Sequence, residues 1–337
     1  MTQIKDFLNQ TTFSQLSVSP DGRCVAFVVR SAETDTKSLW LYDFQTEECY
    51  KLLESSQFLG CFYWEDAEHL FYLARGVGQN TWCRRYYVET LVDDEICIIP
   101  SSAREVWQVG QRYVFRKEQE EGQATQSGLY AMSVHGGRVT QLTPEGVAVE
   151  QAVQCPEGLF CLTRTGDRAE PGICFLSKDG EMMEQVVEEG EYPITHLAAD
   201  TDPLTGTARV SFTAEDHFYT VEEGEVVLLP IPADTISDTV CGAFRYGTHN
   251  DFCMHQGGFA YIAAEQTSTV VKQADFSGHT ALCTPEGGRV DGFAYLPDGS
   301  LCFAGYRNTE LPELYLMKQE QLCQLTHLNE GRLDARK

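Results

Sequence analysis

Seven short, mostly apolar residue pairs recur along this 337-residue chain at nearly regular intervals. Their first members are separated by 46, 44, 44, 42, 54 and 43 residues. The pairs are Leu52-Leu53, Ile98-Ile99, Leu142-Thr143, Val186-Val187, Leu228-Leu229, Leu282-Cys283 and Leu325-Thr326. A period of roughly 40–50 residues is typical of a β-propeller, in which each repeat forms one four-stranded blade. The sequence therefore predicts an all-β, seven-bladed β-propeller with four antiparallel strands per blade over residues 12–329.

The segments between these pairs have the composition of strands. Runs of aromatic, β-branched and aliphatic residues alternate with turns rich in Gly, Asp, Glu and Pro. Examples are SLWLYDF (residues 38–44), AEHLFYLA (67–74), QRYVFRK (111–117), GLFCLTR (158–164), ARVSFTA (208–214), GGFAYIAA (257–264) and ELYLMKQ (313–319). The only helix that the pattern predicts is a short one at residues 3–9.

The same turn occurs near both ends of the chain, as SPDG at residues 19–22 and LPDG at residues 296–299. Proline fixes its own φ, aspartate bonds the backbone, and glycine accepts a positive φ. We predict that this turn joins the second and third strands of a blade. Intermediate blades have looser versions, such as CPEGL at residues 155–159 and HQGGF at residues 255–259.

The two ends of the repeat array predict how the ring closes. The first repeat begins with its own inner strand, near residues 12–19, and the last contains its own outer strand, near residues 321–325. No strand is left for exchange between the termini. We therefore expect no terminal-strand closure, and we expect blades one and seven to meet through side-chain packing alone.

The charge of the chain limits its partners. Fifty acidic residues against 25 basic ones give a net charge of −25. Such a field repels the phosphates of nucleic acids and the anionic surface of a membrane, so we expect neither as a partner.

Cysteine usage and the absence of targeting signals indicate the compartment. The N-terminal segment lacks the apolar core of a signal peptide, and no run of about 18 apolar residues would span a membrane. The 13 cysteines include no C-x-x-C pair. Buried free thiols in a reducing cytosol, without disulfides, are the expectation, and we predict a cytoplasmic protein.

The sequences of the first and last predicted blades resemble those of a known protein family. The opening FSQLSVSPDGRCVAFVV, followed by SLWLYDFQTEECYKL, and the closing PELY (residues 312–315) with LTHLN (325–329) are similar to the propeller of prolyl oligopeptidase family serine peptidases. The acylaminoacyl-peptidase-like branch, with its seven blades, is the most similar. The resemblance covers the whole chain in organisation but only these two blades in letters.

The resemblance implies that the propeller and the catalytic residues belong to different domains. In this family the propeller caps an α/β-hydrolase domain that carries a G-x-S-x-G nucleophile elbow, and no G-x-S-x-G occurs here. It therefore implies that residues 1–11 contact that domain, that residues 12–329 form the propeller, and that residues 330–337 begin the linker to a C-terminal hydrolase. We expect the propeller half of a longer peptidase, inactive alone, which gates small peptides and docks on the hydrolase domain. The alternative is a stand-alone TolB-like or WD40-like propeller that binds a protein or ligand, and a third hypothesis is a propeller with chemistry at its own centre.

No catalytic residue is predicted in this chain. The eight histidines, at positions 69, 135, 196, 217, 249, 255, 279 and 327, are scattered over different blades. Nucleophilic catalysis requires a base within hydrogen-bond reach of the nucleophile, and the sequence places no histidine beside one. We assign no substrate-binding residues.

One stretch, THNDFCMHQ, carries residue types that bind zinc. If residues 248–256 form a strand, His249, Asp251, Cys253 and His255 share one face. Neighbours two apart on a strand lie about 6.5–7 Å apart, so four in a row do not converge on one ion. We therefore expect a half-polar strand facing the central tunnel, and neither a metal nor another cofactor.

Three further patterns have a functional and a structural interpretation. The DTDPLTG stretch (residues 200–206) resembles a calcium loop but is interpreted as a blade-connecting turn. The glutamate pairs at 188–189 and 222–223 are interpreted as hairpin turns, and the pair at 120–121 as part of a polar loop. The stretch WCRRYYVE (82–89) would supply two arginines to a carboxylate, but an ordinary strand with cation–π packing is the favoured interpretation.

Overall fold

The computed structural model describes residues 11–330 except 32–33, 35, 54–56, 122–123, 167–169, 181–182, 202–204, 216, 232–251, 256, 266–267 and 308–309. The side chains of residues 118–121, 124–126 and 265 are also outside the description. The helix predicted at residues 3–9 therefore lies outside the described residues. Within them, no helix is long and apolar enough to cross a membrane.

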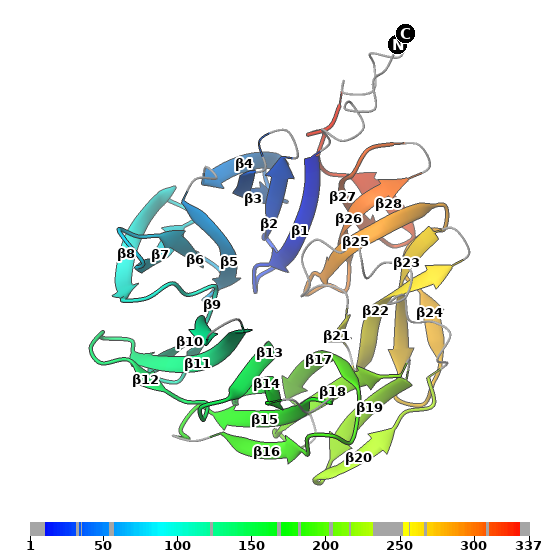
Figure 1. The fold of residues 1–337 in the computed structure, drawn as a ribbon. Helices are drawn as coiled ribbons and strands as arrows, with labels where there is room; N and C mark the ends of the chain where they lie inside the picture. Colours follow the sequence, from blue (N-terminus) through cyan, green and yellow to red (C-terminus); the bar gives the residue numbers. More distant parts are fainter. Residues whose placement is uncertain are drawn as a thin grey trace.

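The described residues form seven separate four-stranded sheets arranged in a ring (Figure 1). The innermost strands are β1 (Thr11–Val18), β5 (Phe58–Trp64), β9 (Glu105–Val109), β13 (Val147–Cys155), β17 (Ile194–Thr201), β21 (Phe252–His255) and β25 (Gly288–Tyr295). The second strands are β2 (Cys24–Ser31), β6 (His69–Arg75), β10 (Arg112–Glu121), β14 (Gly158–Thr165), β18 (Ala208–Ala214), β22 (Gly258–Glu265) and β26 (Leu301–Arg307).

The two outer strands of each blade complete the ring. The third strands are β3 (Thr36–Asp43), β7 (Thr81–Tyr87), β11 (Ala124–Ser133), β15 (Gly172–Ser177), β19 (His217–Glu222), β23 (Ser268–Asp275) and β27 (Glu313–Lys318). The outermost strands are β4 (Glu48–Leu53), β8 (Val92–Ile99), β12 (Thr140–Gln141), β16 (Glu184–Val187), β20 (Glu225–Leu228), β24 (Thr280–Leu282) and β28 (Gln321–Gln324). All pairings within the sheets are antiparallel and sequential. The predicted seven-bladed, four-stranded architecture is confirmed.

The hydrophobic core lies between the blades, and strand β2 shows why. Its side chains point alternately to opposite faces, so Val25 and Phe27 pack against blade seven. Ala26 and Val28 pack against blade two on the other face. A strand buried on both faces has a continuous apolar run rather than an alternating one, and this explains the uninterrupted CVAFVV of the sequence.

The closing pairs end the outermost strands, with one displacement. In five blades the second member of the predicted pair is buried at the blade boundary, for example Ile99 and Val187, whereas in blade one Leu52 and Leu53 are both half-buried. In blade six the buried residue is Thr284, one position later, whereas Leu282 is 50% exposed. Thr284 makes the contact that Thr143 and Thr326 make in blades three and seven: its side-chain hydroxyl accepts from a backbone amide of the third strand, here that of Val271 in β23 at 2.9 Å.

The proline turns join the first and second strands of their blades, so the prediction that they join the second and third is wrong. SPDG lies between β1 and β2 because β1 is itself the innermost strand and leads directly into the turn. The predicted roles of Asp21 and Gly22 are confirmed: Asp21 accepts from the Arg23 amide, and Gly22 has φ = 75°. Because blades one and seven are neighbours in the ring, the two turns meet. A Cβ on Gly22 would lie 2.8 Å from the Pro297 ring.

A buried set of hydrogen bonds closes the ring, and we call it the clasp (Thr11, Pro312, Glu313, Thr326 and Asn329). The Asn329 side chain accepts from the Thr11 amide at 2.9 Å and donates to the Thr11 carbonyl at 3.0 Å. It also donates to the Pro312 carbonyl at 2.6 Å. Glu313 holds the other side of Asn329 by accepting from its backbone amide at 2.6 Å.

Among the described residues, no strand is exchanged between blades one and seven, as predicted, because β28 pairs within its own blade and β1 within the first. Phe13 and Leu16 of blade one do pack against Leu314 of blade seven. The prediction that packing alone joins these blades is nevertheless wrong, because the clasp adds buried polar contacts. Buried backbone amide and carbonyl groups require hydrogen-bond partners, and Asn329 supplies them for Thr11 at the start of β1.

Candidate functional site

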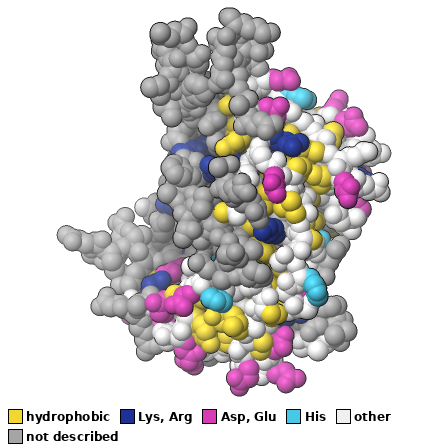
Figure 2. Space-filling view, turned by 90° about the vertical axis from the view of Figure 1, so that its right-hand side faces the viewer, with side chains coloured by type: hydrophobic (Ala, Val, Ile, Leu, Met, Phe, Trp, Pro, Cys, Tyr) yellow, Lys and Arg dark blue, Asp and Glu magenta, His cyan; other side chains and the backbone are white. Residues whose placement is uncertain are grey.

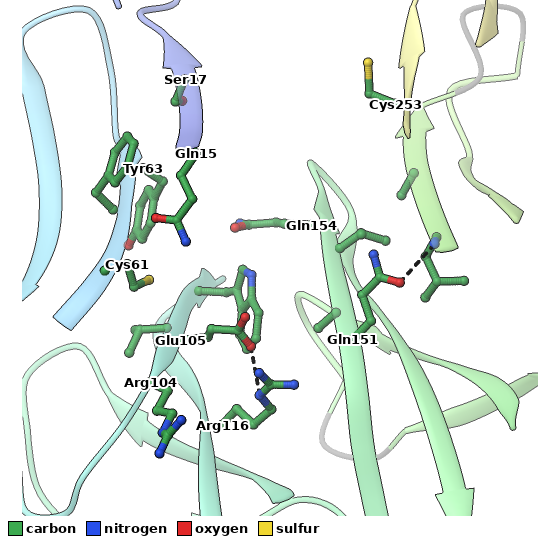
Figure 3. A pocket seen from close by; sticks show the side chains of 18 of the residues that line it. Gln15, Ser17, Cys61, Tyr63, Arg104, Glu105, Arg116, Gln151, Gln154 and Cys253 are labelled. Carbon is green, nitrogen blue, oxygen red and sulfur yellow. Dashed lines mark hydrogen bonds and ion pairs between the residues drawn. The ribbon is translucent and has the colours of Figure 1, made fainter. Parts of the chain in front are cut away.

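A cavity of about 570 Å³ lies inside the ring, among the innermost strands of six blades. It is lined by residues 15–17 of β1, 59–63 of β5, 104–107 at β9, 151–154 of β13, 197–199 of β17 and 252–254 of β21, together with Lys37 and Arg116. This volume lies within the range of roughly 300–1,000 Å³ that is usual for small-molecule sites. The cavity is therefore the candidate functional site (Figure 3).

β-bulges shape the cavity wall. The register of the innermost strand shifts between Ser14 and Ser17 in β1 and between Val149 and Gln151 in β13, and comparable shifts occur in β5, β17 and β25. A bulge bends its strand and redirects the side chains next to it. In β1 it places Gln15, with φ = 54°, at the cavity.

Two glutamines of β13 are held in place by backbone groups. The Gln151 side-chain oxygen accepts from the Leu197 amide of β17 at 3.1 Å. The Gln154 side-chain nitrogen donates to the Gln108 carbonyl at 2.7 Å, and its side chain points toward the open centre of the view in Figure 3. The side-chain nitrogen of Gln151 and the side-chain oxygen of Gln154 are not used in these bonds. This wall of the cavity therefore offers both a donor and an acceptor to a ligand.

The cavity differs in charge from the rest of the molecule. Its described lining holds three cationic side chains, Lys37, Arg104 and Arg116, and one carboxylate, Glu105. Arg116 pairs with Glu105 at 2.8 Å and donates to the Glu150 carbonyl at 2.7 Å. On the outer face drawn in Figure 2, by contrast, Asp and Glu side chains are spread among apolar ones from top to bottom. In a chain of charge −25, this lining favours an anionic group inside the ring.

Two polar atoms on the blade-one and blade-two side of the cavity are buried without a hydrogen-bond partner among the described residues. They are the side-chain oxygen of Gln15 and the hydroxyl of Tyr63, whose side chains lie beside each other in Figure 3. Burial raises the pKa of Tyr63 well above its usual value, so the phenol stays protonated. An unsatisfied buried polar atom costs about 1–3 kcal/mol, so this wall is built at the expense of stability.

Replacing Gln15 by glycine is expected to raise the free energy of unfolding by about 1 kcal/mol. Glycine adopts a φ of 54° without steric cost, and the change also removes an unsatisfied buried oxygen. Thermal unfolding measures the difference. Gln154→Gly is the matched control, because Gln154 has no positive φ, and this variant should be less stable than the parent. A Gln15→Gly protein that unfolds at a lower temperature than the parent would contradict the strain argument.

Of the four residues in the zinc-like stretch (residues 248–256), the structure describes two, and these two have different surroundings. His249 and Asp251 lie outside the described residues. Cys253 lines the cavity, whereas the His255 ring stacks on Tyr295 of blade seven with centroids 3.6 Å apart. Burial lowers the pKa of His255. Among the described residues, no group of three His, Cys, Asp or Glu side chains is placed to hold a metal.

The two arginines of residues 82–89 lie on strand β7, as predicted, but their partners are carboxylates of their own blade. Arg84 pairs with Asp93 at 2.6 Å, and Arg85 pairs with Glu65. Ion pairs thus take the place of the favoured cation–π packing, because Asp93 of β8 and Glu65, the residue after β5, lie next to these arginines.

The acidic stretches have structural roles that differ in detail from those predicted. Glu223 and Gly224, with φ of 51° and 85°, form the predicted hairpin turn between β19 and β20. The pair at 188–189 instead lies in the connection from blade four to blade five, and the pair at 120–121 lies at the end of β10 rather than in a loop. Asp200, predicted in a blade-connecting turn, lies in β17 within blade five and pairs with Arg209 at 2.7 Å.

The sequence did not reveal the cavity residues because they are spread over six different repeats. A signal was nevertheless present: the innermost strand begins a few residues after each closing pair, and its polar residues interrupt an otherwise apolar run. Arg104-Glu105 after Ile99 is one example, and Gln151 with Gln154 after Thr143 is another. Aligning the seven units on their closing pairs would have collected these residues.

No sequence-family model matches the chain, and neither does any curated protein. Solved structures do match. The acylaminoacyl peptidase of Pyrococcus horikoshii has a TM-score of 0.66 at 13% identity, over 98% of this chain and 55% of that one. The β-propeller domain of the Trilobed protease from Pyrococcus furiosus, described as having an open velcro topology, has a TM-score of 0.63 at 13% identity, over 96% of this chain and 98% of that one.

A third match is a protein of another class. An oligogalacturonate lyase in complex with manganese has a TM-score of 0.62 at 14% identity, over 91% of this chain and 90% of that one. At these identities the likeness is one of fold. The chain is a seven-bladed propeller similar to the propeller domains of acylaminoacyl peptidase and the Trilobed protease, and it spans about half the length, 55%, of the acylaminoacyl peptidase.

Proposed function

We propose that this propeller is the non-catalytic, substrate-gating and domain-docking part of a serine peptidase that acts on oligopeptides. The observation that carries the proposal is the axial cavity of about 570 Å³ in a fold shared with acylaminoacyl peptidase, where the match covers 55% of the longer chain. The 45% of the acylaminoacyl peptidase chain outside the match leaves room for an α/β-hydrolase domain, which the resemblance of blades one and seven implies.

The clasp supports the docking role. Because Asn329 bonds both backbone groups of Thr11, the chain enters and leaves the ring at one point. Thr11 pairs with Ser31, and Ser31 pairs with Thr36, so the next residue, Lys37, lies at the same end of the ring. A domain joined after Asn329 would therefore begin at the end of the cavity that carries Lys37.

The cavity lining supports the gating role for peptides. A peptide in extended conformation presents amide donors and acceptors and ends in a carboxylate. Gln151 and Gln154 match the amide groups, and the cationic excess at Lys37, Arg104 and Arg116 matches the carboxylate. A cavity of about 570 Å³ would admit an extended peptide but is too small for a folded protein.

Gln154→Trp in the protein that carries both domains tests the gating role. The larger side chain narrows the cavity where Gln154 points inward, so we expect kcat/KM for an octapeptide reporter to fall about tenfold while a single-residue anilide is affected less than twofold. Gln141→Trp, at an exposed position of β12, is the matched control. If Gln154→Trp lowered kcat/KM for the octapeptide no more than for the anilide, peptides would not pass through the ring.

A stand-alone binding propeller is the second candidate, and one observation favours it. Two oligogalacturonate lyases match over 90% and 91% of their own chains, so this fold makes up nearly all of each of those chains. The coding sequence after Lys337 discriminates between the two candidates. An in-frame G-x-S-x-G elbow within the next few hundred codons supports the peptidase, and a stop codon supports the stand-alone module.

A further inference from the structure

Blade two carries three cysteines, one each on strands β5, β7 and β8. Phe62, the neighbour of Cys61 on β5, pairs with Tyr72 of β6. Leu73 of β6 pairs with Cys83 of β7, and Cys83 pairs directly with Cys97 of β8. All three cysteines pack into the same apolar cluster between blades two and three. Cys83 and Cys97 are therefore adjacent on one face of the blade.

The two thiols are next to each other but differ in burial. Cys83 is fully buried and Cys97 is partly accessible. The hydrogen bond from Cys83 lowers the pKa of Cys97, and the same bond together with burial raises the pKa of Cys83. Cys97 is therefore assigned as the nucleophilic member of the pair, because its thiolate forms more readily and the residue, unlike Cys83, is only partly buried.

A second opposed pair of cysteines, in blade four, provides a comparison. Cys161 of β14 lies opposite Cys174 of β15. The Cys174 thiol, however, donates to the Gln185 side-chain oxygen at 3.4 Å and lies 3.4 Å from the Thr163 hydroxyl. Its sulfur is engaged by groups other than Cys161, so this pair serves as an internal comparison.

We propose that Cys83 and Cys97 are an oxidation site, which a peroxide converts to a disulfide within blade two. Directly opposed residues of antiparallel strands have Cα atoms about 4.5–5.5 Å apart, within the range of about 4.4–6.8 Å that disulfides span. Cys61 is excluded as the partner, because two strand spacings separate it from Cys83 by about 9.5 Å.

The reaction balances with one peroxide. The Cys97 thiolate attacks hydrogen peroxide, its S–O bond forms, the O–O bond breaks, and hydroxide leaves with the proton of the original thiol as water. Cys83 sulfur then attacks the Cys97 sulfenic acid, the S–S bond forms, the S–O bond breaks, and the second water carries away the Cys83 proton. Two thiols lose two electrons and two protons, and one peroxide is reduced to two waters.

The disulfide joins the outermost strand of blade two to its neighbour. Strand β8 is an edge strand with Val92 51% exposed and Ile98 43% exposed, and only β7 holds it within the sheet. A crosslink that closes a short hairpin loop restricts the unfolded chain. We therefore expect oxidation to raise the unfolding temperature by roughly 3–6 °C.

The experiment exposes the native 337-residue chain to hydrogen peroxide at a few equivalents, alkylates the remaining thiols after denaturation, and maps the peptides without reduction. The expected result is a linked pair of peptides containing Cys83 and Cys97, at least tenfold more abundant than a Cys161–Cys174 link, and reversed by dithiothreitol. Cys97→Ser should abolish both the link and the rise in unfolding temperature. Cys161→Ala, the matched control, should change neither.

The Cys83→Ala variant separates the two steps. Without the resolving thiol, Cys97 should accumulate as a sulfenic acid that dimedone labels, at a level at least fivefold above the parent chain. If Cys83→Ala does not fold, the parent chain still decides the matter. A Cys83–Cys97 link no more abundant than the Cys161–Cys174 link, or Cys97 oxidised to sulfinic acid while Cys83 stays a free thiol, would overturn the proposal.

Discussion

Asn329→Ala is expected to lower the free energy of unfolding by about 4 kcal/mol and the unfolding temperature by roughly 6–10 °C. The Asn329 side chain makes three buried hydrogen bonds, two to Thr11 and one to Pro312. Its removal leaves three backbone groups buried without partners, and each costs about 1–3 kcal/mol. Thermal unfolding measures the loss, and amide hydrogen exchange at Thr11 localises it to the junction of blades one and seven.

His327→Ala is the matched control for the clasp. His327 lies two residues away, its side chain is 56% exposed, and its ion pair with Glu330 is on the surface. Exposed pairs contribute at most about 1 kcal/mol, so this variant should unfold within 2 °C of the parent. If Asn329→Ala were as stable as His327→Ala, the ring would be closed by packing alone and the clasp would have no energetic role.

Gly305→Ala is expected to destabilise the protein by at least about 3 kcal/mol, enough to reduce the soluble yield. A Cβ on Gly305 would lie 1.9 Å from the Arg289 carbonyl oxygen and 3.0 Å from its carbon, in the adjacent strand β25. Both atoms belong to the backbone, so no side-chain rotation relieves the clash, and overpacking of this kind costs about 1–3 kcal/mol or more. Gly305 also pairs with Glu313, so the shift would reach the clasp.

Gly180→Ala provides the comparison for glycine substitution as such. The nearest atom to a Cβ there is the Ser177 Cβ at 3.2 Å, and Gly180 has no positive φ. Its unfolding temperature should change by less than about 2 °C, since the entropic gain of alanine offsets a small repacking cost. Similar stabilities for Gly305→Ala and Gly180→Ala would mean that β25 moves away from β26 without penalty.

The clasp explains the letters on which the family resemblance rests. PELY supplies the Pro312 carbonyl and the Glu313 carboxylate, and LTHLN supplies Thr326 and Asn329. These residues therefore close the ring and take no part in the cavity. These letters of the resemblance are structural, which is why they carry information on architecture but none on a substrate.

The candidate site was much less predictable than the fold. The zinc-like stretch and the arginine pair attract attention in the sequence because reactive residue types are adjacent there. In the structure, His255 stacks on Tyr295, and Arg84 pairs with Asp93 within its own blade. The cavity wall instead combines Gln15, Arg116 and Gln154, which stand in three different repeats. Local patterns do not record such combinations, because they depend on the closure of the ring.

The sequence by itself determined the number of blades, the identity of most strands and the residues of the proline turns, because the repeat period, apolar runs and φ preferences are local properties of the chain. Only the tertiary structure decided which side chains meet. Thr11 and Asn329 are 318 positions apart, and Cys83 meets Cys97 only through one particular register of β7 and β8. A shift of one residue in a strand moves every side chain to the opposite face. Contacts of this kind are therefore set by ring closure and strand register, which no single repeat encodes.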